Sequence, residues 1–404
     1  MATRRVGSLA ISFVAALSVG FAALGLVGCE DDVKPFTKSK VLGGVKISAE
    51  TLEAGRESFT HYCRACHGDK GDGRGPSALG LRPPPRDFTQ GKFKFAAVES
   101  GSLPNDEDFR RIVRGGLHGT AMLPWEVPEQ ELDNIIQYIK TFSPKWEKGK
   151  PGKPIVAPPD PWASNQSAAI ARGKELYHVT TQCSGCHPSY ATKGDIAAMT
   201  LRVKKFALTG FRDDMYGAVL KESEYRTTLR PLEEPPNTEH AAKTHHKHEG
   251  KEAKKEANGE EKEGAIQAAR YFPMSILPPD FLRSELRSGD ALTDLYRTIA
   301  AGVGGTAMPA WIATAPYTDP NTGEKWEGEK DIWALAHYVR SLVELKNTRA
   351  ADELHNRLVN QPAWTPPPPP EPVAPEPASS AKPASSAAPA SSAKAPKKPA
   401  PPAP

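Results

Sequence analysis

The sequence has little net charge, few cysteines and a low share of apolar residues. Its 404 residues include 52 lysines and arginines against 48 aspartates and glutamates, so no basic nucleic-acid-binding surface is indicated. Apolar types make up 38%, because polar segments dilute the parts that can fold. The chain has one long apolar run, from Val6 to Val27, which excludes a membrane protein with several spans.

The single apolar run has the order of an export signal. Arg4 and Arg5 precede it, and Gly28-Cys29 end it before an acidic stretch. This ending resembles the bacterial lipobox, whose cysteine is acylated and becomes the first residue of the mature chain. The resemblance implies a lipoprotein signal peptide over 1–28 and a lipid on Cys29. An uncleaved membrane-spanning helix is the alternative, because the run is longer than a usual signal core.

Either interpretation places the body of the protein outside the cytoplasm. We expect it in the bacterial cell envelope, facing the periplasm and anchored by lipid to the inner or the outer membrane. Residues 29–46 are then a tether, and the contact with the membrane runs through this N-terminal anchor.

The other four cysteines occur in two identical C-x-x-C-H units. These units are Cys63-Arg-Ala-Cys66-His67 and Cys183-Ser-Gly-Cys186-His187. C-x-x-C-H is the attachment signature of c-type haem. On a helical turn its three key residues share one face, so two thiols add to the vinyl groups of one porphyrin and the histidine meets the iron. A zinc site needs four ligands and each unit supplies three. The sequence therefore predicts two covalently bound haem c groups, with both histidines as iron ligands.

A repeated segment downstream of each unit supplies a candidate second iron ligand. Residues 108–122 match residues 294–308, and both copies end in Gly-Thr-Ala-Met. Thioether sulfur is a soft ligand that favours reduced iron, so Met122 and Met308 are predicted axial ligands. Core methionines that fill gaps are the alternative. Three further methionines lie between His187 and Met308 and compete for the second iron: Met199, Met215 and Met274.

Two further features repeat around these motifs. A glycine lies upstream of each haem unit, at Gly55 and Gly173, and an amphipathic helical pattern follows each methionine, with Tyr138 or Tyr338 in it. We expect the first helix of each copy to cross the last one closely at the glycine, near the tyrosine.

Together these parts resemble class I c-type cytochromes, in particular the cytochrome c modules of bacterial terminal oxidases and related respiratory complexes. The shared order is a helix, C-x-x-C-H, irregular loops, a methionine loop and a final helix. The resemblance implies an all-α fold of two tandem domains, 47–143 and 166–347, each wrapped around a covalent haem and joined by a Pro-rich linker at 144–165. It also implies His/Met ligation of iron and electron transfer.

The resemblance extends to one residue beside the first iron ligand. Gly75-Pro76 is similar to the cytochrome Gly-Pro turn, whose proline carbonyl accepts a hydrogen bond from the ligand histidine. Such a bond fixes the histidine tautomer and strengthens it as a donor to iron. Pro76 is therefore the expected partner of His67, and no such turn follows His187.

Two segments fall outside the cytochrome pattern. Met122 follows His67 by 55 residues, whereas Met308 follows His187 by 121, so the second domain contains an insertion. Its centre, about 231–264, is rich in lysine, glutamate and histidine and is predicted to be disordered. A C-terminal extension, 348–404, becomes rich in Pro, Ala and Ser from about residue 362 and is predicted to be disordered from there.

These features predict a dihaem cytochrome that transfers single electrons between extracytoplasmic redox proteins, with a membrane respiratory complex as one candidate partner. Two irons closed by histidine and methionine leave no open position, which argues against an enzyme, and no catalytic residue is assigned. The alternative is a dihaem redox enzyme, peroxidase-like or a sulfur-compound dehydrogenase, with an open haem in the second domain.

Overall fold

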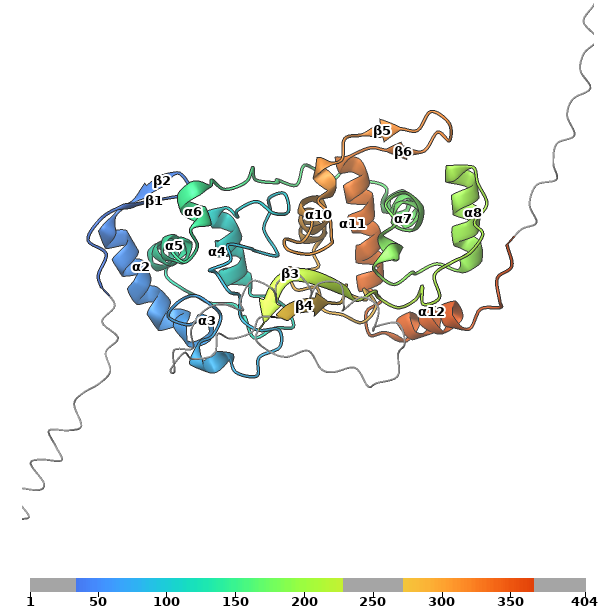
Figure 1. Cartoon of the computed structure of the whole chain (residues 1–404). Coiled ribbons are helices and arrows are strands. Elements are labelled where there is room, and N and C mark those ends of the chain that lie inside the picture. The colour runs from blue at the N-terminus through green and yellow to red at the C-terminus, as the bar shows by residue number, and fades with distance from the viewer. Residues whose placement is uncertain (1–33, 228–271, 367–404) are drawn as a thin grey trace, which may run out of the picture. The chain divides into compact units, whose positions relative to one another are not determined.

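The computed structural model describes residues 34–227 and 272–366 (Figure 1). The predicted signal peptide, Cys29, the centre of the insertion and the extension beyond residue 366 lie outside the described residues. The described residues up to Trp364 belong to one compact unit, so contacts do not separate the two predicted domains. We refer to these predicted domains as module 1 (47–143) and module 2 (166–347).

Helices are the main regular elements of the described structure. Module 1 contains four and the linker one: α2 (Ala49–Tyr62), α3 (Arg64–His67), α4 (Asp106–Gly115), α5 (Glu129–Lys140) and α6 (Lys145–Lys148). The described residues of module 2 contain four, and one follows them: α7 (Gln166–Glu175), α8 (Lys193–Lys204), α10 (Leu292–Ala301), α11 (Glu329–Val343) and α12 (Arg349–Val359). Across 34–227 and 272–366, no helix is both long enough and apolar enough to cross a membrane.

The all-α prediction needs a correction, because three antiparallel two-stranded ribbons accompany the helices within 34–227 and 272–366. They are β1 (Lys40–Leu42) with β2 (Val45–Ile47), β3 (Lys221–Thr227) with β4 (Phe272–Ile276), and β5 (Tyr317–Thr318) with β6 (Lys325–Trp326). The first ribbon lies in the segment predicted as a tether. Its Leu42 is fully buried in the core, so the fold begins before residue 47. The second ribbon flanks the centre of the insertion.

The first and last helices of each module cross at a glycine, as predicted. A Cβ at Gly55 in α2 would lie 2.2 Å from the carbonyl oxygen of Asn134 in α5. A Cβ at Gly173 in α7 would lie 2.1 Å from the carbonyl oxygen of Ala334 in α11, and 2.6 Å from the Cβ of Tyr338. These distances are too short for any side chain, so only glycine permits the two backbones to approach this closely.

Replacing Gly173 with alanine should separate α7 from α11. Overpacking a tight contact costs about 1–3 kcal/mol, so the free energy of unfolding should fall by about that amount. Guanidinium unfolding followed by far-UV circular dichroism measures the change. Gly194→Ala in α8 is the matched control, because its Cβ would have no neighbour closer than 3.9 Å. Equal stability of the two variants would contradict the close crossing.

Each module has its own apolar core. The core of module 1 gathers around α2 and α5, and the core of module 2 around α7, α10 and α11. The linker joins both cores, because Trp146 is fully buried in the first and Trp162 packs against the second. The linker is therefore part of the packed structure and does not hang free between the two cores.

The two modules contact each other through two hydrogen bonds that involve equivalent residues of the repeat. The backbone N–H of His118 donates to the carbonyl of Arg287, and that of Gly304 donates to the carbonyl of Lys94, both at 3.1 Å. Gly304 occupies the place of His118 in the sequence repeat, so the same contact is made in both directions. A Cβ at Gly304 would lie 2.1 Å from the carbonyl oxygen of Phe93, which explains glycine at that position.

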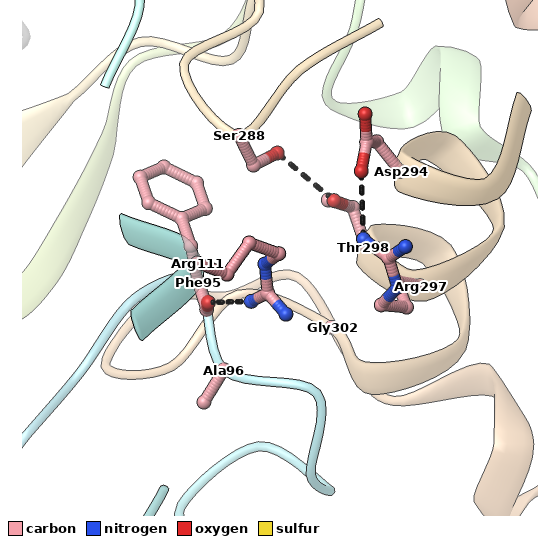
Figure 2. A pocket seen from close by; sticks show the side chains of 8 residues that line it. All are labelled: Phe95, Ala96, Arg111, Ser288, Asp294, Arg297, Thr298 and Gly302. Atoms are coloured by element: carbon pink, nitrogen blue, oxygen red, sulfur yellow. Dashed lines mark hydrogen bonds and ion pairs between the residues drawn. The ribbon is translucent and has the colours of Figure 1, made fainter. Parts of the chain in front are cut away.

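A small pocket lies at this boundary (Figure 2). Arg111 donates to the carbonyl of Phe95 at 2.7 Å, and Arg297 pairs with Asp294 at 2.6 Å. The hydroxyls of Ser288 and Thr298 bond to each other. The polar side chains that line the pocket are thus bonded within its wall, and the pocket is part of the packing between modules.

Candidate haem-binding sites

Both C-x-x-C-H units fold as a single helical turn. The backbone N–H of His67 donates to the carbonyl of Cys63, and that of His187 donates to the carbonyl of Cys183, both at 2.9 Å. The four cysteines of the units are free thiols and half-buried. In each unit, therefore, two unpaired sulfurs and a histidine lie on one turn, as attachment to a porphyrin requires.

The pKa of one thiol in each unit is raised, unlike that of a redox-active cysteine. Burial, followed by the neighbouring Cys66, raises the pKa of Cys63 to about 12, and burial raises the pKa of Cys183 to about 11. Redox-active cysteines have a lowered pKa instead. The electrostatic setting therefore argues against a thiol–disulfide site.

Each predicted ligand histidine is oriented by one backbone carbonyl. Nδ1 of His67 lies 3.1 Å from the carbonyl oxygen of Arg86, and Nδ1 of His187 lies 3.1 Å from that of Pro279. A carbonyl only accepts, so Nδ1 carries the proton and Nε2 keeps its lone pair for iron. Burial lowers the pKa of His67 to about 4 and also lowers that of His187. Both imidazoles are neutral at pH 7, the form that binds a metal.

The prediction for Pro76 is wrong, because Arg86 provides the carbonyl that accepts from His67. Pro76 instead begins a turn of 3₁₀ helix over Pro76–Ala78. The N–H of Gly75 donates to the carbonyl of Cys66 at 3.1 Å, and a Cβ there would lie 2.2 Å from the carbonyl oxygen of Ala65. The Gly-Pro turn thus lies against the backbone of α3, and a later part of the loop reaches the histidine.

An Asp-Phe pair follows each carbonyl that orients a histidine, and its phenylalanine packs on the imidazole ring. The ring of Phe88 stacks on His67 with centroids 4.5 Å apart and planes at 19°, and Phe281 stacks on His187 at 5.0 Å and 18°. In both modules the carbonyl that accepts from the histidine lies two residues before the phenylalanine. The sequence signal was present, since Pro-Pro-Arg-Asp-Phe at 84–88 resembles Pro-Pro-Asp-Phe at 278–281.

The two methionine loops have the same internal hydrogen bonds. Thr120 Oγ1 donates to the carbonyl of Leu117 at 2.7 Å and accepts from the N–H of Met122 at 3.1 Å. Thr306 Oγ1 makes the matching bonds to Val303 and Met308, at 2.7 Å and 3.2 Å. The threonine of the Gly-Thr-Ala-Met repeat therefore fixes the backbone at both methionines.

Residues 50–139 match the family model described as cytochrome c oxidase, cbb3-type, subunit III. They form a cytochrome c domain. A domain of this kind carries covalent haem c, and the first C-x-x-C-H unit with its stacked histidine and methionine loop lies within it. The match covers most of module 1 and ends before module 2.

One solved structure is similar to much of the chain. It is a chain of the Kuenenia stuttgartiensis reducing HAO-like protein complex, 23% identical, with a TM-score of 0.47. The similarity covers 72% of this chain and 96% of that chain. The comparison with curated proteins found no match.

Module 2 repeats the site features of the cytochrome c domain and adds a network of its own. The hydroxyl of Tyr190 donates to Oδ1 of Asp280 at 2.9 Å and accepts from the N–H of Phe281 at 2.7 Å. This network fixes the segment whose phenylalanine stacks on His187. Sequence reasoning missed it, because Tyr190 precedes Asp280 by 90 residues and belongs to no recognisable motif.

Two of the three methionines that compete with Met308, namely Met199 and Met215, have other surroundings. Met199 and Met215 are buried in a separate apolar cluster with Val179 and Ile196. Met308 packs against the main core of module 2, and so does Cys183. Met199 and Met215 therefore fit the role of core residues, and Met308 stays the predicted ligand.

Proposed function

We propose that the protein is a dihaem c-type cytochrome that transfers single electrons between redox proteins outside the cytoplasm. The observation that carries this proposal is the repetition of one donor set in both modules. Each has two free thiols, a neutral histidine held by a carbonyl, a stacked phenylalanine and a Thr-fixed methionine loop. Two tandem cytochrome c domains, each around its own haem, account for this repetition.

The residues of each module have distinct tasks toward the haem. A bound haem supplies the one-electron chemistry. Cys63 and Cys66 would hold the first porphyrin and Cys183 and Cys186 the second. His67 and His187 would bind iron through Nε2, while their Nδ1 protons stay on backbone carbonyls. The stacked phenylalanines limit water access and rotation of the imidazoles. Met122 and Met308 would be the second protein ligands of the two irons.

The optical spectrum of the resting protein tests this function against an enzyme. A carrier should show two low-spin haems with the methionine–iron charge-transfer band. A high-spin haem that binds cyanide or peroxide readily in the resting protein would contradict the proposal and support a dihaem redox enzyme with an open haem in module 2. The identical hydrogen bonds of the two methionine loops favour the carrier.

The proposal includes a place in the cell envelope, with the N-terminal lipobox-like sequence as its support. Cys29→Ala should remove the acylation site, so the protein should leave the membrane fraction or accumulate as an unprocessed precursor. Fractionation of cells with immunoblotting measures both outcomes, and Cys63→Ala, whose thiol lies in the haem motif, controls for the loss of a cysteine as such. Unchanged processing and membrane anchoring of Cys29→Ala would contradict a lipid on this residue.

The partners are proposed to be redox proteins, including a membrane respiratory complex. Purification of the full chain under mild detergent conditions, followed by identification of bound haem or metal proteins, tests this point. Stoichiometric recovery with a membrane oxidoreductase would support a subunit of a complex, and recovery of the chain alone would contradict stable assembly.

A further inference from the structure

The end of the C-x-x-C-H turn accepts hydrogen bonds from different donors in the two modules. In module 1, the backbone N–H of Gly73 donates to the carbonyl of His67 at 2.9 Å, and that of Gly75 donates to the carbonyl of Cys66 at 3.1 Å. Both donors come from the glycine-rich loop that directly follows the turn. The end of the first turn is therefore capped by neutral backbone groups.

In module 2 the insertion supplies the cap, and one of its donors is a cation. The N–H of Val219 donates to the carbonyl of Cys186 at 2.8 Å, which repeats the bond made by Gly75 in module 1. The carbonyl of His187 accepts instead from Nη2 of Arg212 at 3.2 Å. An arginine side chain stays protonated at every physiological pH, so a positive charge lies at the backbone of the predicted iron ligand.

The Arg212 guanidinium forms no ion pair within 34–227 and 272–366. Its Nη2 also donates to the carbonyls of Met215 and Gly217, at 3.2 Å and 2.7 Å, and its Nε is buried without a partner among the same residues. Asp213 and Asp214 of this loop are exposed, so water screens their charges more than that of the half-buried guanidinium. The charge that faces the turn is therefore positive.

The loop that carries this guanidinium is held from two sides. Met215 is buried in the second apolar cluster of module 2. From the C-terminal side, the amide of Gln361 donates to the hydroxyl of Tyr216, and the ring of Trp364 meets that of Phe211 edge-on, with centroids 4.9 Å apart. The segment that follows α12 thus packs on the loop, and the cation keeps a fixed place at the turn.

We propose that Arg212 raises the reduction potential of the haem in module 2. The inference rests on the proposed function, since it needs a haem bound at His187. Oxidation adds one positive charge to the iron, and a fixed cation nearby disfavours that state. In module 1 the neutral N–H of Gly73 takes the matching place. The insertion thereby changes the electrostatic setting of one haem without changing its predicted ligands.

Neutralising Arg212 tests this role in the full-length holoprotein. Arg212→Gln removes the charge but keeps a hydrogen-bond donor, so one of the two reduction potentials should fall and the other should stay. An optical redox titration gives both potentials, and the one that falls should be the one that Met308→Ala also lowers. Arg212→Lys keeps the charge and should keep the wild-type potential. Arg349→Gln is the matched control, because this arginine of α12 is 92% exposed, and should leave both potentials unchanged.

The outcomes separate this inference from the proposed function. Unchanged potentials in Arg212→Gln, with two haems still bound, would overturn the role of Arg212 and leave the proposed function intact. Equal falls in Arg212→Gln and Arg212→Lys would show an effect of loop structure instead of charge, which also overturns it. If Arg212→Gln loses the second haem, Arg212→Lys decides: the wild-type potential supports the role, and a lowered one overturns it. Fewer than two haems in the wild type would overturn the proposed function as well.

Discussion

Met122→Ala should leave the haem of module 1 attached but turn it high-spin. Thioether bonds at Cys63 and Cys66 would not depend on the methionine, whereas the second protein ligand of the iron would be lost. Sulfur ligation favours reduced iron, so its loss should lower the reduction potential of that haem. Axial ligands set haem potentials over roughly 0.8 V, so we expect a fall on the order of 0.1 V or more. Optical and electron paramagnetic resonance spectra report the spin state, and a redox titration reports the potential.

Substitutions at two other methionines complete the test. Met199→Leu replaces a buried core residue with one of similar volume, so it should leave both haem spectra unchanged. Met308→Ala should reproduce the effect of Met122→Ala on the haem of module 2. A low-spin spectrum with the charge-transfer band intact in Met122→Ala would remove Met122 as a ligand.

The double substitution Cys183→Ser and Cys186→Ser should halve the covalent haem of the protein. Both thiols of module 2 are then gone, while the cytochrome c domain at 50–139 keeps its own pair. Mass spectrometry of the intact chain should show the loss of one haem mass. This variant tests module 2 directly, where the match to the cytochrome family does not reach.

The equivalent double substitution in module 1 isolates the haem of module 2. Cys63→Ser with Cys66→Ser should also leave one haem, and its spectrum should be that of module 2 alone. The two single-haem spectra should then sum to the wild-type spectrum. An unchanged mass in the Cys183 and Cys186 variant would show that module 2 carries no covalent haem.

Local motifs predicted the parts of the site that are close in sequence. C-x-x-C-H fixes two thiols and a histidine within one helical turn, and the structure places them so. The repeated glycine of the first helix predicted the crossings at Gly55 and Gly173, because a backbone contact excludes a side chain. The periodicity of the last helix of each module gave the buried face that covers these glycines.

Features that depend on distant residues were missed or misassigned. The carbonyl of Arg86, not that of Pro76, accepts from His67, since a loop conformation decides which carbonyl reaches the ring. α12 was not predicted, yet Ala351 and Leu358 are buried against the rest of the chain. The sequence predicts a tether where the ribbon with Leu42 lies, because three-residue strands leave almost no periodic signal.

The contact between the modules could not be predicted from the sequence either. Gly304 and His118 hold equivalent places in the repeat, and nothing in the sequence explains why the two residues differ. The structure shows that Gly304 lies against the carbonyl of Phe93, where no side chain fits. Such a requirement arises from packing between segments about two hundred residues apart, and no local pattern encodes it.

The haem content of the purified chain tests the central claim most directly. Pyridine haemochrome absorbance, divided by protein concentration from quantitative amino-acid analysis, gives the number of c-type haems per polypeptide. The proposed arrangement predicts two, one for each C-x-x-C-H unit. A value of one or less in fully matured protein would contradict it.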